Sequence, residues 1–217
     1  MAELETTWRP SSAWSGILAD SHQGADGAGG VTVAARDNLG IASIIAGAGD
    51  TSALAEAVKA RFGLDLPMTP VAAMSGSHSL VWSGHGHWLL VAGSREGLAD
   101  DLAALAPLAA VAEQSDGRAA LRLSGAMVRR ALAKGCMVDL HPSAFPVGMT
   151  ALSSIAYIGV QLWRAQDEPN GEDGPGGAVF EIMVPRSMAG SFWSWFSASA
   201  AEFGCQILIE GPTTGRG

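Results

Sequence analysis

The residues best suited to chemistry lie close together near the middle of the chain. Cys136, Asp139 and His141 offer a thiol, a carboxylate and an imidazole in one short stretch, the groups that nucleophilic catalysis combines. The same stretch contains one aromatic ring and two stiff residues: Phe145, Pro142 and Pro146. No Gly-x-Ser-x-Gly elbow or oxyanion loop accompanies them. We therefore favour a structural role, a fixed segment between a helix and a strand that Asp139 and His141 hold by hydrogen bonds.

Two other patterns could bind a cofactor or a metal. Gly47–Ser52 follows a predicted strand and opens a predicted helix, like half of a dinucleotide fingerprint. Ser52 replaces the third glycine, and Asp50 puts a carboxylate where a pyrophosphate would bind, so we interpret the run as a glycine turn. His85 and His87 would share one strand face, but no further ligand is near in the sequence. A hairpin tip is the favoured interpretation, and we predict no metal site.

Composition excludes several classes of protein. The 217 residues are 48% hydrophobic, which is enough for a real core, and carry a net charge of −8, which argues against a nucleic-acid surface. No apolar run is long enough to cross a membrane, and the acidic first residues do not resemble an export signal. With only Cys136 and Cys205 present, we expect reduced thiols and a cytoplasmic location. Small buried side chains are favoured over a catalytic thiol.

The ends of the chain read as tails. Residues 1–30 are rich in Ala, Gly, Asp and Ser, and we expect a flexible N-terminal tail there; residues 211–217 form a second tail. Trp8 and Trp14 interrupt the first one. Because large rings gain nothing in water, this tail should dock either on its own domain or on a partner, with self-docking favoured.

Between the tails, one order of elements occurs twice. Val31–Ala35 and Ile41–Ala46 are predicted strands joined by a turn at Asp37-Asn38, and Thr51 should cap a helix that ends at Gly63. The remaining predicted strands are Leu80–Trp82, Trp88–Ala92, Ala109–Ala112, Ala119–Leu123, Leu152–Trp163, Val179–Val184 and Cys205–Ile209. The remaining predicted helices are Leu98–Leu105, Ala126–Lys134 with Gly135 as C-cap, and Ser187–Phe203 with Ser187 as N-cap.

This order predicts an α+β protein made of two ferredoxin-like βαββαβ halves. We place the first half at residues 31–115 and the second at 116–210. In the last helix, one broad face indicates core packing and carries Met188, Phe192, Trp195, Phe196 and Phe203. Trp193 lies at the edge of that face, so it is the ring we favour to reach a partner or ligand, with core packing the open alternative.

Several short motifs, in this order, resemble the gamma subunit family of heterotetrameric sarcosine oxidase. The first half carries Leu66-Pro67, Leu80-Val81-Trp82 and His87-Trp88-Leu89-Leu90-Val91. The second half carries Leu123-Ser124-Gly125, Leu132 to Cys136, Asp139-Leu140-His141-Pro142, Phe145-Pro146, Gly148, Val184 to Ser187, Trp193 to Trp195 and Glu202-Phe203-Gly204. The Asp-Leu-His-Pro block is the most specific of them, and the resemblance extends over about residues 41–204.

The resemblance implies a function. Such a complex oxidatively demethylates an N-methyl amino acid and passes the one-carbon unit to tetrahydrofolate. FAD, FMN, NAD and tetrahydrofolate are expected on its larger subunits, and this chain would hold no cofactor and no catalytic residue. Its partners would be the larger flavin-bearing subunits, with neither nucleic acid nor membrane. The implied fold resembles the folate-binding domains of aminomethyltransferases.

The candidate partner-interface or family-motif residues are Asp139, His141, Pro142, Phe145, Arg186 and Trp193. An isolated chain should be inactive, and whether it self-associates stays open, as do the exact amine substrate and the stoichiometry. A stand-alone folate-dependent aminomethyl transferase is the main alternative function. A regulatory ligand-binding module is a weaker alternative, because no residue pattern in the sequence indicates which ligand it would bind.

Overall fold

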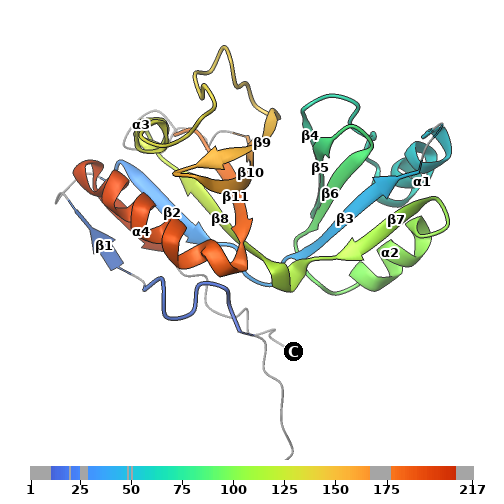
Figure 1. Ribbon diagram of the computed structural model, residues 1–217, viewed down its shortest axis with the longest axis horizontal. Coiled ribbons are helices and arrows are strands. Elements are labelled where there is room, and N and C mark those ends of the chain that lie inside the picture. Colours follow the sequence, from blue (N-terminus) through green and yellow to red (C-terminus); the bar gives the residue numbers. More distant parts are fainter. Residues whose placement is uncertain are drawn as a thin grey trace, which may run out of the picture.

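The structure, a computed structural model, describes residues 11–19, 21–24, 29–47, 49, 51–166 and 177–208. Within these residues two β-sheets form a frame that Figure 1 shows as the two arms of a V. The larger sheet has the strand order β1 (Ser21–Gln23), β12 (Cys205–Leu208), β2 (Val31–Ala35), β8 (Arg118–Ser124), β11 (Phe180–Pro185), β10 (Ile158–Arg164) and β9 (Thr150–Ile155). The smaller sheet has the order β4 (Ala72–Ser75), β5 (His78–Gly84), β6 (His87–Ala92), β3 (Gly40–Ala46) and β7 (Ala109–Glu113).

The helices cover the outer faces of the two arms (Figure 1). α1 (Ser52–Phe62) and α2 (Leu98–Leu105) pack on the smaller sheet, and α3 (Val128–Ala133) and α4 (Ala189–Ala200) pack on the larger one. Short 3₁₀ segments occupy Ser115–Gly117, Arg186–Met188 and Ala201–Phe203. In the part of the chain that the structure describes, every helix is too short or too polar to cross a membrane.

The spacing of apolar residues correctly predicts the buried face of α1. Leu54, Val58 and Phe62 recur every four residues and are all buried, as a helix of 3.6 residues per turn requires. Gly63 ends the helix with φ of 68°, a left-handed conformation in which glycine avoids a steric penalty. Thr51 occupies the predicted N-cap position, but its side chain makes no capping hydrogen bond.

Both predicted ferredoxin-like halves are present. In the smaller sheet the strands order as β5-β6-β3-β7, with the short β4 added at one edge. In the larger sheet β10-β11-β8-β12 follow the same plan, interrupted by β2 between β8 and β12. The α+β class and the double repeat are therefore confirmed.

The position of β2 corrects the predicted hairpin and one domain boundary. Val31–Ala35 does not pair with β3; it lies antiparallel to β8 and parallel to β12, inside the sheet of the second half. Val31 and Val33 are fully buried there. The chain crosses to the smaller sheet at Asn38, whose φ is 60°, instead of turning back. Neighbouring strands in sequence usually pair, but this strand gains more by completing a core that is distant in sequence.

The N-terminal segment is also corrected over its described part. Trp14 is only 3% exposed, and its Nε1–H donates a hydrogen bond of 2.9 Å to the carbonyl oxygen of Ala120 in β8. β1 then pairs antiparallel with β12. The favoured self-docking is thus confirmed for Trp14, whereas Trp8 lies outside the described residues.

Residues 152–163 form a hairpin where a single long strand was predicted. β9 and β10 pair antiparallel through a two-residue turn at Ala156 and Tyr157, whose φ values are 50° and 64°. Two positive φ values define a type I′ turn. Such turns usually contain Asn or Gly, and neither residue is present to signal this one.

The last predicted helices are shortened. α3 begins at Val128 and its C-cap is Lys134, in the right-handed region; Gly135 does not end it in a left-handed conformation as predicted. α4 begins at Ala189, after a 3₁₀ turn that contains Ser187, so Ser187 is not its N-cap. Ile209, the predicted end of the last strand, lies outside the described residues.

A third core joins the two arms of the V. It is built from side chains on the facing sides of the two sheets and on the crossing strands: Leu39, Ile41, Ala72, Val81, Leu89, Val91, Ala120, Trp163 and Met183. Beside it, the buried Gln161 side chain donates to Thr150 Oγ1 at 2.7 Å and accepts from Ser83 Oγ of the other sheet at 2.9 Å. Backbone bonds from Ala72 to Gly148 and from Thr150 to Pro70 further join the halves.

Candidate functional site

The segment with the most specific sequence motif, 139–146, is a compact turn. Asp139 Oδ1 accepts a 2.8 Å hydrogen bond from the backbone N–H of His141. The carbonyl oxygen of His141 accepts from the backbone N–H of Ala144 and of Phe145. His141 Nδ1 lies 2.7 Å from Ser143 Oγ. The predicted role of Asp139 and His141 in fixing the loop by hydrogen bonds is confirmed.

Two arginines stabilise this turn from its buried side. Arg129 of α3 donates from Nε to the carbonyl oxygen of Leu140 at 3.0 Å, and Arg164 of β10 donates from Nη1 to that of Phe145 at 3.2 Å. Phe145 is 1% exposed, and its ring lies 6.3 Å from that of Phe180. A buried aromatic anchor and two charged donors on backbone carbonyls make a rigid loop.

Asp139, His141 and Pro142 are exposed on the outside of this anchored turn. Sequence reasoning identified the exposed residues but missed the two arginines below them. The available signal was Arg164, a charged residue ending a strand whose other members are mostly buried. Charged side chains are seldom buried without a partner, so its position indicated a partner nearby.

The turn does not have the geometry of a catalytic triad. A triad needs the carboxylate on the imidazole ring, with the other ring nitrogen on the nucleophile. Here Asp139 binds the backbone N–H of His141, while the backbone N–H of Ser143 donates to Nδ1 at 3.3 Å. Nδ1 is therefore an acceptor, and the neutral ring carries its proton on Nε2. The arrangement positions a hydrogen-bond donor at the surface; it does not activate Ser143.

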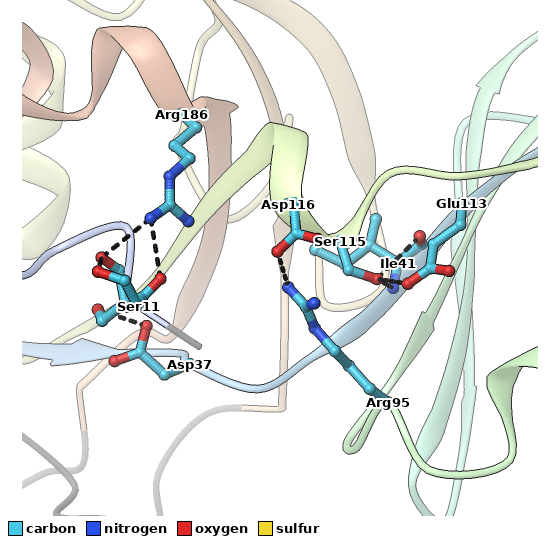
Figure 2. Close-up of polar contacts among 9 residues, drawn as sticks. Ser11, Asp37, Ile41, Arg95, Glu113, Ser115, Asp116 and Arg186 are labelled. Atoms are coloured by element: carbon cyan, nitrogen blue, oxygen red, sulfur yellow. Dashed lines mark hydrogen bonds and ion pairs between the residues drawn. The ribbon is translucent and has the colours of Figure 1, made fainter. Parts of the chain in front are cut away.

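Arg186 lies elsewhere and serves the N-terminal segment, as Figure 2 shows. Its Nη2 donates to the backbone carbonyls of Ser11 at 2.8 Å and Ser12 at 3.3 Å. Ser12 Oγ in turn donates to Asp37 Oδ1 at 2.7 Å. The family-motif arginine thus contacts the docked N-terminal segment of its own chain.

A second group of polar residues in Figure 2 lies where the chain crosses from the smaller sheet to the larger one, between β7 and β8. Arg95 donates to Asp116 at 2.6 Å, and this hydrogen bond lowers the pKa of the Asp116 carboxyl and raises that of the Arg95 guanidinium. Ser115 Oγ accepts from the backbone N–H of Ile41 at 3.0 Å and donates to Glu113. Both connections between the halves are therefore held by side chains.

Trp193 belongs to the core, which is the alternative that the sequence left open beside contact with a partner or ligand. Its side chain is 8% exposed, and its ring centroid lies 6.4 Å from that of the fully buried Phe196. Trp195, also on α4, is half-buried. Helical phase alone placed Trp193 at the edge, but the core is larger than this helix and its sheet, since Trp14 and Ile17 of the docked segment belong to the same cluster.

Neither cysteine is prepared for catalysis. Burial raises the pKa of the Cys136 thiol, and it raises that of Cys205 to about 11. Reactive cysteines need a lowered pKa, because the thiolate is the nucleophile. The favoured structural role of both side chains is therefore supported.

The two cofactor-like patterns remain weak. A hollow of about 230 Å³ lies beside Gly47 and Thr51, and it is lined by Ala46, Gly47, Thr51, Ala53, Leu54, Pro107 and Leu108. These residues offer no charge to a pyrophosphate; Ala48 and Asp50 lie outside the described residues. His85 and His87 are both exposed at the β5–β6 tip, and the described residues contain no group of three or more His, Cys, Asp or Glu side chains arranged for a metal.

Comparison with known proteins gives a consistent family. The model of the sarcosine oxidase, gamma subunit family matches residues 46–202. The sarcosine oxidase subunit gamma of Corynebacterium sp. (strain P-1) is 34% identical over 126 residues, which are 57% of this chain and 61% of that protein. That of Arthrobacter sp. is 34% identical over 116 residues, covering 52% and 57%. These matches span less than two thirds of the relatives' own length.

Solved structures agree with this family. A chain of the heterotetrameric sarcosine oxidase from Corynebacterium sp. U-96, in complex with pyrrole 2-carboxylate, is 27% identical with a TM-score of 0.72, over 89% of this chain and 96% of that one. The glycine cleavage system aminomethyltransferase T of Bartonella henselae reaches a TM-score of 0.56 at 12% identity, over 85% of this chain and 48% of that one. The second likeness concerns the fold alone.

Proposed function

Because the chain belongs to the sarcosine oxidase gamma subunit family, we propose that it is the non-catalytic gamma subunit of a sarcosine oxidase-like complex. Such a complex oxidatively demethylates an N-methyl amino acid and passes the one-carbon unit to tetrahydrofolate. The observation that carries the proposal is the likeness to a chain of a heterotetrameric sarcosine oxidase over 89% of this chain.

In this proposal the reaction takes place on the larger subunits. They hold FAD, FMN, NAD and tetrahydrofolate in the cytoplasm, and the present chain contributes to assembly. Its described residues support that division of labour. The strongest motif builds a rigid turn instead of a catalytic triad, and the thiols have raised pKa values.

The exposed part of the 139–146 turn is proposed as one contact with those subunits. The carboxylate of Asp139 and the Nε2–H of His141 offer an acceptor and a donor on a surface that is already ordered. An ordered loop loses little conformational entropy when a partner binds. Phe145 and Arg186 act through the fold, one below the turn and the other on the N-terminal segment.

The first test is the chemistry of the chain alone. Purified by itself, it should show no flavin absorbance and no turnover of sarcosine or other N-methyl amino acids. Flavin bound by the lone chain, or turnover by it, would contradict the proposal. Titration with tetrahydrofolate tests the alternative transferase function, which requires saturable binding to the isolated chain.

A further inference from the structure

Charge is distributed very unevenly along this chain. Although 16% of all residues are Asp, Glu, Lys or Arg, none occurs from Leu66 to Ser94, and Asp139 is the single one from Gly135 to Trp163. The first segment forms β4, β5 and β6, and the second forms the anchored turn, β9 and β10. Depletion of charge is typical of the centre of protein–protein interfaces.

The same two segments carry most of the large apolar side chains that the described structure leaves exposed. They are Met68, Val71, Met74, Met137, Val147, Leu152 and Tyr157, which we call the apolar edge surface. Figure 1 shows the segment before β4 and the loop between α3 and β9 at the same end of the molecule, away from the crossing strands. Scattered exposed apolar residues are ordinary, whereas a gathered set marks an interaction site.

The surface lies along β9, the strand at one edge of the larger sheet. Val71 forms an isolated bridge with Met149 just before β9, and Met137 donates from its backbone N–H to the carbonyl oxygen of Ser154 near its other end. Side chains alternate along a strand. Thr150, Leu152 and Ser154 therefore lie on the same face of β9, the one that faces the other sheet. The other sheet does not cover this face at Leu152, whose side chain is 62% exposed.

Tyr157, at the tip of the β9–β10 hairpin, is the most unusual member. The single tyrosine of the chain is fully exposed there with φ of 64°. A left-handed conformation is costly for such a residue, and Asn or Gly would avoid that cost. The same chain uses Asn38 at a comparable φ of 60°. An aromatic ring kept at a strained and exposed tip gains nothing from the fold of the isolated chain.

We propose that the apolar edge surface is where a larger subunit of the complex docks, with Tyr157 inserted into an apolar pocket of that subunit. The proposal rests on the proposed function, which supplies the partner. The lack of Lys and Arg in both segments disfavours an anionic membrane, which attracts basic residues. Tyrosine is among the residues that contribute most at the centres of interfaces.

The turn allows a test in which stability and binding should change in opposite directions. Tyr157→Asn removes the ring but relieves the backbone strain, so the isolated chain should melt at the same or a higher temperature. Its affinity for the larger subunits should nevertheless fall by about tenfold or more. Leu152→Glu and Met137→Glu, at exposed positions, should also weaken assembly, because each buries a charge at the interface.

Two matched variants serve as controls. Ala156→Gly relieves the strain of the same turn while keeping the ring, and Leu108→Glu places the same charge at an exposed position outside the surface. Both should assemble like the wild type. Affinities are measured by titrating the 217-residue chain into the remaining subunits of the same organism, and melting temperatures by circular dichroism.

The possible outcomes separate the two proposals. If the wild type assembles and Tyr157→Asn, Leu152→Glu and Met137→Glu assemble equally well, the docking surface is wrong while the subunit function stands. If the wild type does not assemble at all, the proposed function fails, and the docking proposal fails with it. Binding of the wild type to anionic vesicles, or a homodimer lost in Tyr157→Asn while assembly persists, would also overturn the docking proposal.

Discussion

At the scale of single residues, close approaches explain positions that sequence patterns misread. Gly135 was predicted as a helix C-cap, yet a Cβ at this position would lie 2.5 Å from Cζ2 of Trp195. The glycine is required by a ring sixty positions away. Likewise, the turn formed by Asp139 and His141 was predictable from local hydrogen bonding. The position of Arg164 indicated a partner, but not which one, because the carbonyl groups that Arg129 and Arg164 bind lie 11 and 19 residues away in the sequence.

Gly135→Ala should therefore destabilise the fold. Overpacking against a half-buried ring costs about 1–3 kcal/mol, measured as the free energy of unfolding in urea. Gly159→Ala is the matched control, because a Cβ there meets nothing within 4 Å and φ is not positive. Equal stabilities for the two variants would show that Trp195 moves aside freely.

The buried thiol of Cys205 should make stability depend on alkaline pH. Its pKa rises from 9.0 to about 11 on burial, so between these values the unfolded state loses the thiol proton more readily than the folded state. The free energy of unfolding should thus fall as the pH rises from 9 to 11. Cys205→Ala should show a shallower fall over this window in urea titrations; an unchanged slope would contradict the assigned pKa.

At the scale of elements, local periodicity predicts what each segment buries, but not which sheet it joins. The four-residue spacing of Leu54, Val58 and Phe62 was sufficient for α1. The alternation in β2 was equally clear, yet its partners β8 and β12 lie far along the chain, with every strand of the smaller sheet between β2 and β8. The N-terminal segment has the same non-local character, since Trp14 binds a carbonyl in β8.

Trp14→Ala should accordingly behave as a core truncation. Loss of a buried tryptophan costs about 3–5 kcal/mol, whereas Trp14→Phe should cost about 1 kcal/mol. The difference arises because Phe retains most of the packing, and the carbonyl of Ala120 keeps its second donor, the backbone N–H of Arg36. Chemical denaturation of both variants measures these values, and a Trp14→Ala protein as stable as the wild type would refute the docked position.

At the scale of the whole molecule, the two halves depend on each other. The predicted boundary at residue 115 separates β2 from the sheet that it completes, and the third core is shared between the two sheets. The repeat was visible in the sequence. The insertion of β2 into the larger sheet and the shared core were not visible, because both consist of contacts between distant segments.

A fragment of residues 116–217 should therefore fail to fold alone. It lacks β2 and the ring of Trp14, so far-UV circular dichroism should show little cooperative melting. Adding a peptide of residues 11–37, or fusing it to the fragment, should restore a cooperative transition. Cooperative folding of the unaided fragment would contradict the assigned role of β2.

Native mass spectrometry of the tagged chain, co-expressed with the candidate flavin-bearing subunits of its source organism, tests the proposed role in assembly. The expected result is one stoichiometric complex that contains this chain together with the flavin-bearing subunits. If all flavin-bearing subunits assemble without the chain, and the chain remains alone in the same sample, the proposed assembly role is wrong.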